Sequence, residues 1–137
     1  IAEMIRITRP GGPAAAYVWD LPGGGFPADP IWVELAAAGR PVPQPPSAAI
    51  SKMDALKALW SSGLDKVETK VIEVERSFSG FDDYWDACTG SSSIKGVLNA
   101  LSAEQLAQVK ARVRDRIAAN GNRFTARAHA AKGRIKS

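Results

Sequence analysis

The sequence predicts an α/β fold in which a helix leads directly into a buried strand. The 137-residue chain is 45% hydrophobic and contains four Trp, a composition typical of a globular chain with a real core. Residues 3–12 have the character of a helix end followed by Arg9-Pro-Gly-Gly12, and Pro and Gly end helices because Pro lacks an N–H and Gly accepts positive φ. The apolar run at 14–19 has no alternation, which indicates a strand covered on both faces.

The start of the chain suggests missing structure. A helix that opens a chain and feeds a buried strand implies further structure before it, and the first residue is Ile1 and not an initiator Met. We therefore expect residues 1–137 to be a single fragment of a larger domain.

Residues 21–50 form a proline- and glycine-rich segment that is expected to be a long, partly ordered loop. A short helix over 29–38 would place Ile31, Trp32 and Leu35 on one face. The glycines at 23–25 follow a strand but lead into prolines, so they are interpreted as a loop and not as a nucleotide cradle.

A clear helix is expected from Ser51, with Ser51 and Asp54 resembling a capping box and Gly63 ending the helix in a left-handed conformation. Its apolar face consists of Leu56, Leu59 and Trp60. Residues 67–78 then favour a strand, in which three apolar residues break strict alternation and indicate a bulge or partial cover on both faces: Val71, Ile72 and Val74.

Residues 79–101 are predicted to be an inserted helical segment, with a helix whose stripe is Phe81, Tyr84, Trp85 and Cys88 and a second short helix over 94–101. The next helix begins at Ser102, which forms a capping box with Gln105. Its core stripe is Leu106, Val109, Val113 and Ile117.

The last predicted strand covers 124–131, with Phe124 and the alanines at 126, 128 and 130 on one packed face and His129 on the polar face. Residues 132–137 are expected to fray.

This ordered set resembles the C-terminal half of class I S-adenosylmethionine-dependent methyltransferases of the small-molecule type. In that family a Lys/Arg-Pro-Gly-Gly turn precedes the fifth sheet strand, as Arg9-Pro-Gly-Gly12 precedes residues 14–19 here. The later matches are the helix at 53–63, the sixth strand at 67–74, the inserted helix of one branch at 78–90, and the final antiparallel strand at 124–131. The resemblance implies part of a doubly wound seven-stranded sheet, with three strands, flanking helices and the last strand inserted antiparallel between the other two.

The resemblance also implies what this chain lacks. The family binds its cofactor through a glycine-rich turn, an acidic residue and an Asp-containing segment in the N-terminal half, and none of these is present. S-adenosylmethionine is therefore expected to bind only the full-length parent, whose function would be methyl transfer to a small molecule. Such a transfer is a direct displacement, in which positioning supplies much of the rate. The fragment alone is expected to be inactive.

Five residues are candidates for substrate binding. Trp19 and Asp20 lie at the carboxyl end of the first strand, where α/β folds hold ligands, although Asp20 could equally cap backbone and Trp19 could be core. Phe26 could wall a pocket or simply anchor its loop. Tyr84 and Trp85 could cap a substrate cleft, but an aromatic stripe is more often core.

No catalytic constellation is visible. His129, the only histidine, has no Asp or Cys partner by spacing, and Cys88 continues an apolar stripe as a structural thiol would. One Cys and one His argue against a zinc site, and we expect no metal ligand. One cysteine excludes an internal disulfide framework and fits a reducing, cytoplasmic compartment. No apolar run is long enough to span a bilayer.

Two alternatives remain open. Residues 110–137 carry nine basic side chains and one acidic one, a net charge of +8, which could attract nucleic acid, but no reader motif accompanies them. A stand-alone α+β ligand-binding or interaction domain would need a covered edge on its first strand. A fragment would instead expose that edge, and a homodimer could form through it.

Overall fold

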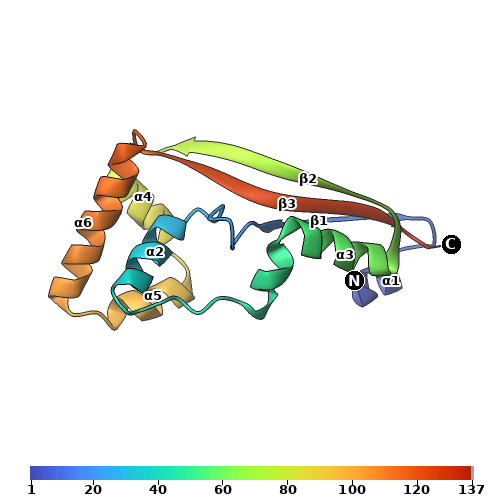
Figure 1. The fold of residues 1–137 in the computed structure, drawn as a ribbon, viewed down its shortest axis with the longest axis horizontal. Helices are drawn as coiled ribbons and strands as arrows, with labels where there is room; N and C mark the ends of the chain where they lie inside the picture. The colour runs from blue at the N-terminus through green and yellow to red at the C-terminus, as the bar shows by residue number, and fades with distance from the viewer. Residues whose placement is uncertain (137) are drawn as a thin grey trace. The chain divides into compact units, whose positions relative to one another are not determined.

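The computed structural model describes residues 1–136, whose strands form one open three-stranded sheet flanked by helices (Figure 1). The elements follow in the order α1 (Ala2–Ile7), β1 (Pro13–Trp19), α2 (Asp29–Ala37), η1 (Pro46–Ser51), α3 (Met53–Gly63), β2 (Leu64–Ser77), α4 (Phe81–Cys88), α5 (Ser92–Asn99), α6 (Ala103–Ala119) and β3 (Arg123–Ile135). The α/β class expected from the sequence is confirmed.

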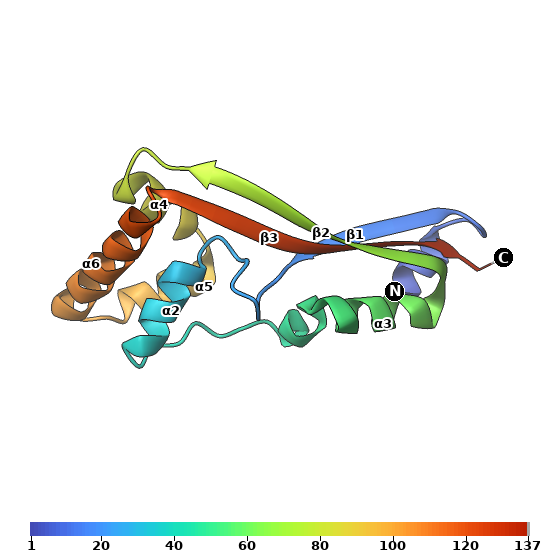
Figure 2. The same cartoon turned by 45° about the horizontal axis from the view of Figure 1, so that its top comes forward.

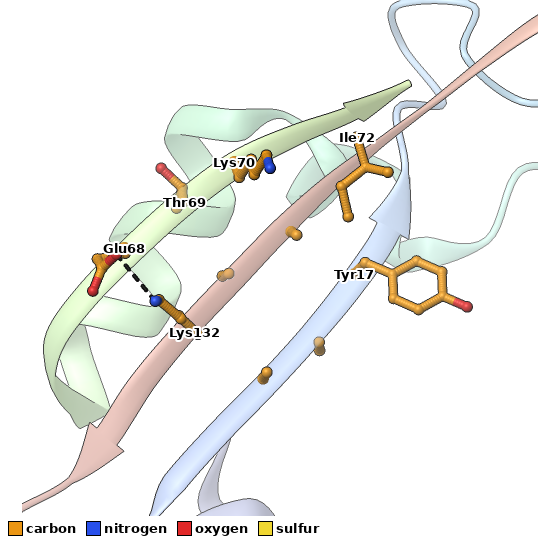
Figure 3. A pocket seen from close by; sticks show the side chains of 10 residues that line it. Tyr17, Glu68, Thr69, Lys70, Ile72 and Lys132 are labelled. Carbon is orange, nitrogen blue, oxygen red and sulfur yellow. Dashed lines mark ion pairs between the residues drawn. The ribbon is translucent and has the colours of Figure 1, made fainter. Parts of the chain in front are cut away.

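The strand order in the sheet is β1-β3-β2. β3 pairs antiparallel with β1, from Pro13 opposite Arg134 to Trp19 opposite Ala128, and it also runs opposite to β2 (Figure 3). The last strand therefore lies antiparallel between the other two, as expected. Because β1 and β2 are parallel to each other, the chain must cross over between them, and α3 forms the last part of that crossover.

The chain divides into two compact units. The first consists of residues 1–26, 45–73 and 127–137, and the second of residues 27–44 and 74–126. The first unit holds α1, η1, α3, β1 and the adjoining parts of β2 and β3. The second holds α2, α4, α5 and α6 with the remaining strand residues.

The core of the first unit lies on one face of the sheet, where α3 and α1 both pack (Figure 1, Figure 2). Leu56 and Trp60 of α3 are buried against Ala14 of β1 and Ala131 and Ile135 of β3. The prediction that Leu56 and Trp60 lie on the core-facing side of α3 is confirmed. Leu59 is exposed and is not part of this core, which corrects the third position.

The opposite face of the sheet corrects the expectation that β1 is covered on both sides. Of its seven residues only Ala14 is buried, and the side chain of Tyr17 is 67% exposed. β2 is exposed on both of its faces in this stretch, since the consecutive residues Val71 and Ile72 are both exposed, as is Val74. The apolar run of β1 predicts cover on both faces, and that of β2 predicts a bulge or partial cover, but no described helix of the first unit packs over this face of the sheet.

The second unit is built around α6, which packs against α2 and α4. Its core contains Val109, Val113 and Ile117 of α6 with Ile31 and Leu35 of α2. The predicted capping box is present: Ser102 Oγ accepts from Gln105 N at 3.1 Å, and Gln105 Oε1 accepts from Ser102 N at 3.0 Å. The helices expected over 29–38, 81–88 and 94–101 are also found, as α2, α4 and α5.

Two predicted helix-end signals are wrong. Ser51 does not cap α3, because it lies in η1 and its Oγ donates to Ala48 O at 2.6 Å. Gly63 does not adopt positive φ. It is needed for close packing instead, since a Cβ there would lie 2.6 Å from Ile1 Cγ2.

β3 corrects two further expectations. The strand continues to Ile135, which is buried, so residues 132–135 do not fray; the last residue, Ser137, lies outside the described residues. The packed face also changes along the strand: Ala126 and Ala128 are buried, but so are His129 and Ala131. His129 is therefore on a packed face and not on a polar one.

Candidate functional site

The carboxyl end of β1 gathers three of the five predicted site residues. The rings of Trp19 and Phe26 meet edge to face, with their centroids 6.3 Å apart. Asp20, next to Trp19, is only 7% exposed. The link between these positions is the tight turn between residues 20 and 25, which folds back so that Gly25 N donates to Asp20 O at 2.8 Å.

The Asp20 carboxylate is held by two groups of the chain itself. Arg127 Nε of β3 donates to Asp20 Oδ2 at 2.8 Å, and Gly23 N donates to Asp20 Oδ1 at 3.0 Å. Arg127 also donates through Nη2 to Gly23 O at 2.7 Å, and its Nη1 lies 3.8 Å from Glu73 Oε1. The backbone-capping alternative for Asp20 thus has direct geometric support.

The glycine turn does not form an open cradle for a phosphate or a nucleoside. A Cβ at Gly23 would collide with the Asp20 carboxylate, and one at Gly25 would lie 2.6 Å from Arg127 O. Gly25 is further fixed by Arg127 N, which donates to its carbonyl at 2.9 Å. These glycines are needed because neighbouring protein atoms lie too close for a side chain, which supports the interpretation of residues 23–25 as a structural turn.

His129 lies beside this cluster. Its Nδ1 is 2.7 Å from the carbonyl oxygen of Ser51, and because a carbonyl only accepts, Nδ1 carries the hydrogen. Its Nε2 is 3.7 Å from Asp20 Oδ2, beyond hydrogen-bond distance. The ring is 8% exposed. Sequence spacing indicates no Asp or Cys near His129, whereas the strand pairing places the Asp20 carboxylate close to its Nε2.

The other two predicted residues, Tyr84 and Trp85, belong to the second unit. The Tyr84 side chain is fully buried, its O–H donates to Pro27 O at 2.9 Å, and burial raises the pKa of its phenol. The Trp85 ring is buried; its centroid lies 5.5 Å from that of Phe81 and 5.1 Å from Lys110 Nζ. Both side chains therefore contribute to the core in this unit.

Most cations of residues 110–136 have partners within their own unit. In α6, Arg112 and Arg116 pair with the buried Glu34, and Arg114 lies over the Phe81 ring at 4.5 Å. Further pairs join β3 to its neighbours: Arg123 with Glu75, Arg127 with Asp20 and Lys132 with Glu68. The basic C-terminal end is thus largely tied into the fold.

The open face of the sheet carries a hollow of about 540 Å³ within the first unit (Figure 3). Its floor is made by alanines of β1 and β3, and Tyr17 and Ile72 stand at its sides. The Lys132–Glu68 ion pair crosses it at one end, at 3.2 Å (Figure 3). The apolar run of β1 predicts a covered strand, so the sequence gives no signal for this hollow.

Within residues 1–136 no three His, Cys, Asp or Glu side chains are arranged to hold a metal ion. In the same residues, each helix is too short or too polar to cross a membrane. No protein-family model and no curated protein matches this chain.

Proposed function

We propose that this chain is the C-terminal part of a class I S-adenosylmethionine-dependent methyltransferase that acts on a small molecule. The observation that carries the proposal is the strand order β1-β3-β2, with the last strand antiparallel in the middle. The family's sheet ends in the same way, with the seventh strand antiparallel between the fifth and the sixth.

The position of the helices adds support. α1 and α3, on either side of β1 in sequence, pack on the same face of the sheet. The other face and the outer edge of β1 remain open within residues 1–136. A doubly wound sheet has helices on both faces, so an open face and edge are the places where the remainder of such a sheet would be added.

In the proposed role the carboxyl end of β1 contributes to the substrate side of the sheet. Asp20 is held in place by Arg127 and Gly23, so it would act as a rigid part of the wall. Trp19 and Phe26 would add apolar surface beside it. No cofactor-binding residue is assigned to this chain.

The two alternatives have less support. A stand-alone α+β ligand-binding or interaction domain would cover the edge of β1 with its own loop, but the turn at 20–25 pairs with β3. A nucleic-acid-binding module would present free cations, whereas Arg112, Arg114 and Arg116 all contact groups of their own unit.

The test is the reading frame upstream of Ile1 and the protein it encodes. We expect a glycine-rich strand–turn–helix roughly a hundred residues upstream. The longer protein should bind S-adenosylhomocysteine in isothermal titration calorimetry, and the 137-residue chain should give no heat under the same conditions. An upstream region without that pattern, or a longer protein that does not bind, would contradict the proposal.

A further inference from the structure

The two edge strands of the sheet differ in how they are protected. β2 carries charged side chains along its length, at Asp65, Lys66, Glu68, Lys70, Glu73, Glu75 and Arg76. Charge on an edge strand discourages pairing with another chain. β1, with the sequence Pro-Ala-Ala-Ala-Tyr-Val-Trp, has none. The edge of β1 therefore lacks the charged side chains that would discourage pairing with another strand.

The direction of the backbone groups of β1 follows from its pairing with β3. Gly12 O accepts from Ile135 N, and Asp20 N donates to Arg127 O. In the observed register these even-numbered residues form hydrogen-bonded pairs with β3. Because such pairs alternate along an antiparallel ladder, the odd-numbered residues of β1 direct their N–H and C=O groups outward.

The outward groups form an incomplete set. Pro13 has a carbonyl but no N–H, which is tolerated only where that position faces away from the ladder. Trp19 has an N–H, but its carbonyl already accepts from Leu21 N at 2.9 Å. Between them, Ala15 and Tyr17 each offer both groups. Within residues 1–136, no backbone hydrogen bond from another segment reaches this edge.

We infer that the outer edge of β1 binds a second copy of the chain, with the two β1 strands antiparallel about a two-fold axis at Ala16. In this register Ala15 lies opposite Tyr17 of the other copy. The Ala15 N–H donates to the Tyr17 carbonyl, and the Tyr17 N–H donates to the Ala15 carbonyl. The Trp19 N–H reaches the Pro13 carbonyl of the other copy. Each outward group then finds its partner, and the two groups that β1 lacks or has already used, the Pro13 N–H and the Trp19 carbonyl, face each other.

Side chains fit the same register. Pairing about a two-fold axis places identical surfaces together, and an uncharged strand brings no like charges into contact. The ring of Tyr17, 67% exposed, projects beyond β1 on the side away from β3 (Figure 3). There it would lie next to Ala15 of the other copy, and an aromatic ring over a small residue is a favourable cross-strand pair. The result is a continuous six-stranded sheet.

The first experiment measures the mass of the 137-residue chain by sedimentation equilibrium over a range of concentrations. We expect a monomer–dimer equilibrium. In hydrogen exchange, the amides of Ala15, Tyr17 and Trp19 should become protected as the dimer forms. A chain that stays monomeric at all concentrations, with rapid exchange at these amides, would overturn the inference.

Two variants test the register. Ala15→Pro removes an outward donor without touching the ladder to β3, and it should weaken dimerisation about tenfold or more. Ala16→Glu and Ala16→Lys each place like charges opposite each other at the axis. Each variant alone should have a higher dimer dissociation constant than the unmodified 137-residue chain. An equal mixture of the two variants should form a heterodimer, because opposite charges then face each other at the axis.

The matched control is Val71→Glu, a similar change at an exposed position of β2, which should leave the dimer unchanged. Circular dichroism confirms that each variant is folded. A dimer that persists in Ala15→Pro and in both single Ala16 variants uses another surface, and this would contradict the inference. The inference concerns the 137-residue chain by itself, because in a longer protein of the proposed kind the remainder of the sheet would occupy the same edge of β1.

Discussion

At the scale of single residues, the cluster at the end of β1 shows why an acidic residue after a strand can be structural. Asp20 is almost fully buried, and both of its carboxylate oxygens are bound by the chain. Arg127 connects it to β3 and to the glycine turn. A buried carboxylate that has partners on two elements fixes the geometry of the loop that leaves the strand.

Replacing Asp20 by Ala should therefore destabilise the first unit strongly. The substitution leaves Nε of Arg127, a side chain about one-third exposed, and the Gly23 N–H without their acceptor. We expect a loss of about 2–3 kcal/mol in the free energy of unfolding, measured by urea denaturation. The control is Glu3→Ala, because its ion pair with Arg6 is highly exposed and should contribute nothing measurable. Equal effects of the two substitutions would contradict this account.

Cys88 should be a slow nucleophile in the folded protein. Burial raises the pKa of its thiol, and its Sγ lies 3.7 Å from Pro27 O. Less thiolate is then present at neutral pH than for a free cysteine, and the thiolate is the reactive form. Alkylation by iodoacetamide, followed by mass spectrometry, should be slower in the native chain than in the chain unfolded in urea. Equal rates in the two states would show that the thiol is accessible and unperturbed.

The closeness of Asp20 and His129 could not be predicted from their spacing along the sequence. Asp20 and His129 are brought together only because Val18 pairs with His129 in the register of β1 and β3. Register depends on the whole sheet and not on local spacing. In contrast, the association of Trp19 with Phe26 is formed within one short turn.

At the scale of elements, the sequence was most informative where the determining contacts are local. The capping box at Ser102 and the stripe of α6 are both present because the interacting residues are three or four positions apart. Ser51 and Gly63 were misjudged because distant contacts decide their roles. The Ser51 hydroxyl donates a hydrogen bond to Ala48 O within η1, and residues of the α1 segment pack so closely against Gly63 that a side chain would not fit there.

The extent of cover on β1 was misjudged for a related reason. An apolar run without alternation predicts two covered faces, but the sequence of a strand does not say which segment supplies the cover. α1 and α3 supply one face, and Tyr17 is exposed on the other. The antiparallel position of β3 in the middle of the sheet was predicted from the family resemblance and not from the periodicity of the strand.

Removing the cap of α6 should weaken the second unit. In Ser102→Ala the Gln105 N–H loses its acceptor, and we expect a loss of about 1 kcal/mol in the free energy of unfolding. Ser93→Ala is the matched control, since the hydroxyl of Ser93 is exposed and contacts only that of Ser91 among the contacts seen. The measurement is urea denaturation followed by circular dichroism. A control that loses as much stability as Ser102→Ala would remove the capping explanation.

At the scale of the whole molecule, the described chain has two cores. Leu56 and Trp60 lie in the core of the first unit. Val113 and Ile117 lie in the core of the second, with α2 packed against them. Because each unit buries its own apolar residues, each should respond separately when its core is damaged.

Native-state hydrogen exchange on two large-to-small variants tests this separation. Leu56→Ala should cost about 2–4 kcal/mol in the first unit, because it removes buried methyl groups and leaves a cavity. The amides of α3 and β1 should then exchange faster, while those of α6 keep most of their protection. Ile117→Ala should produce the reverse pattern at a similar cost. If either substitution lowers protection equally in α3 and α6, the two units unfold together, and the division into separate cores has no energetic meaning.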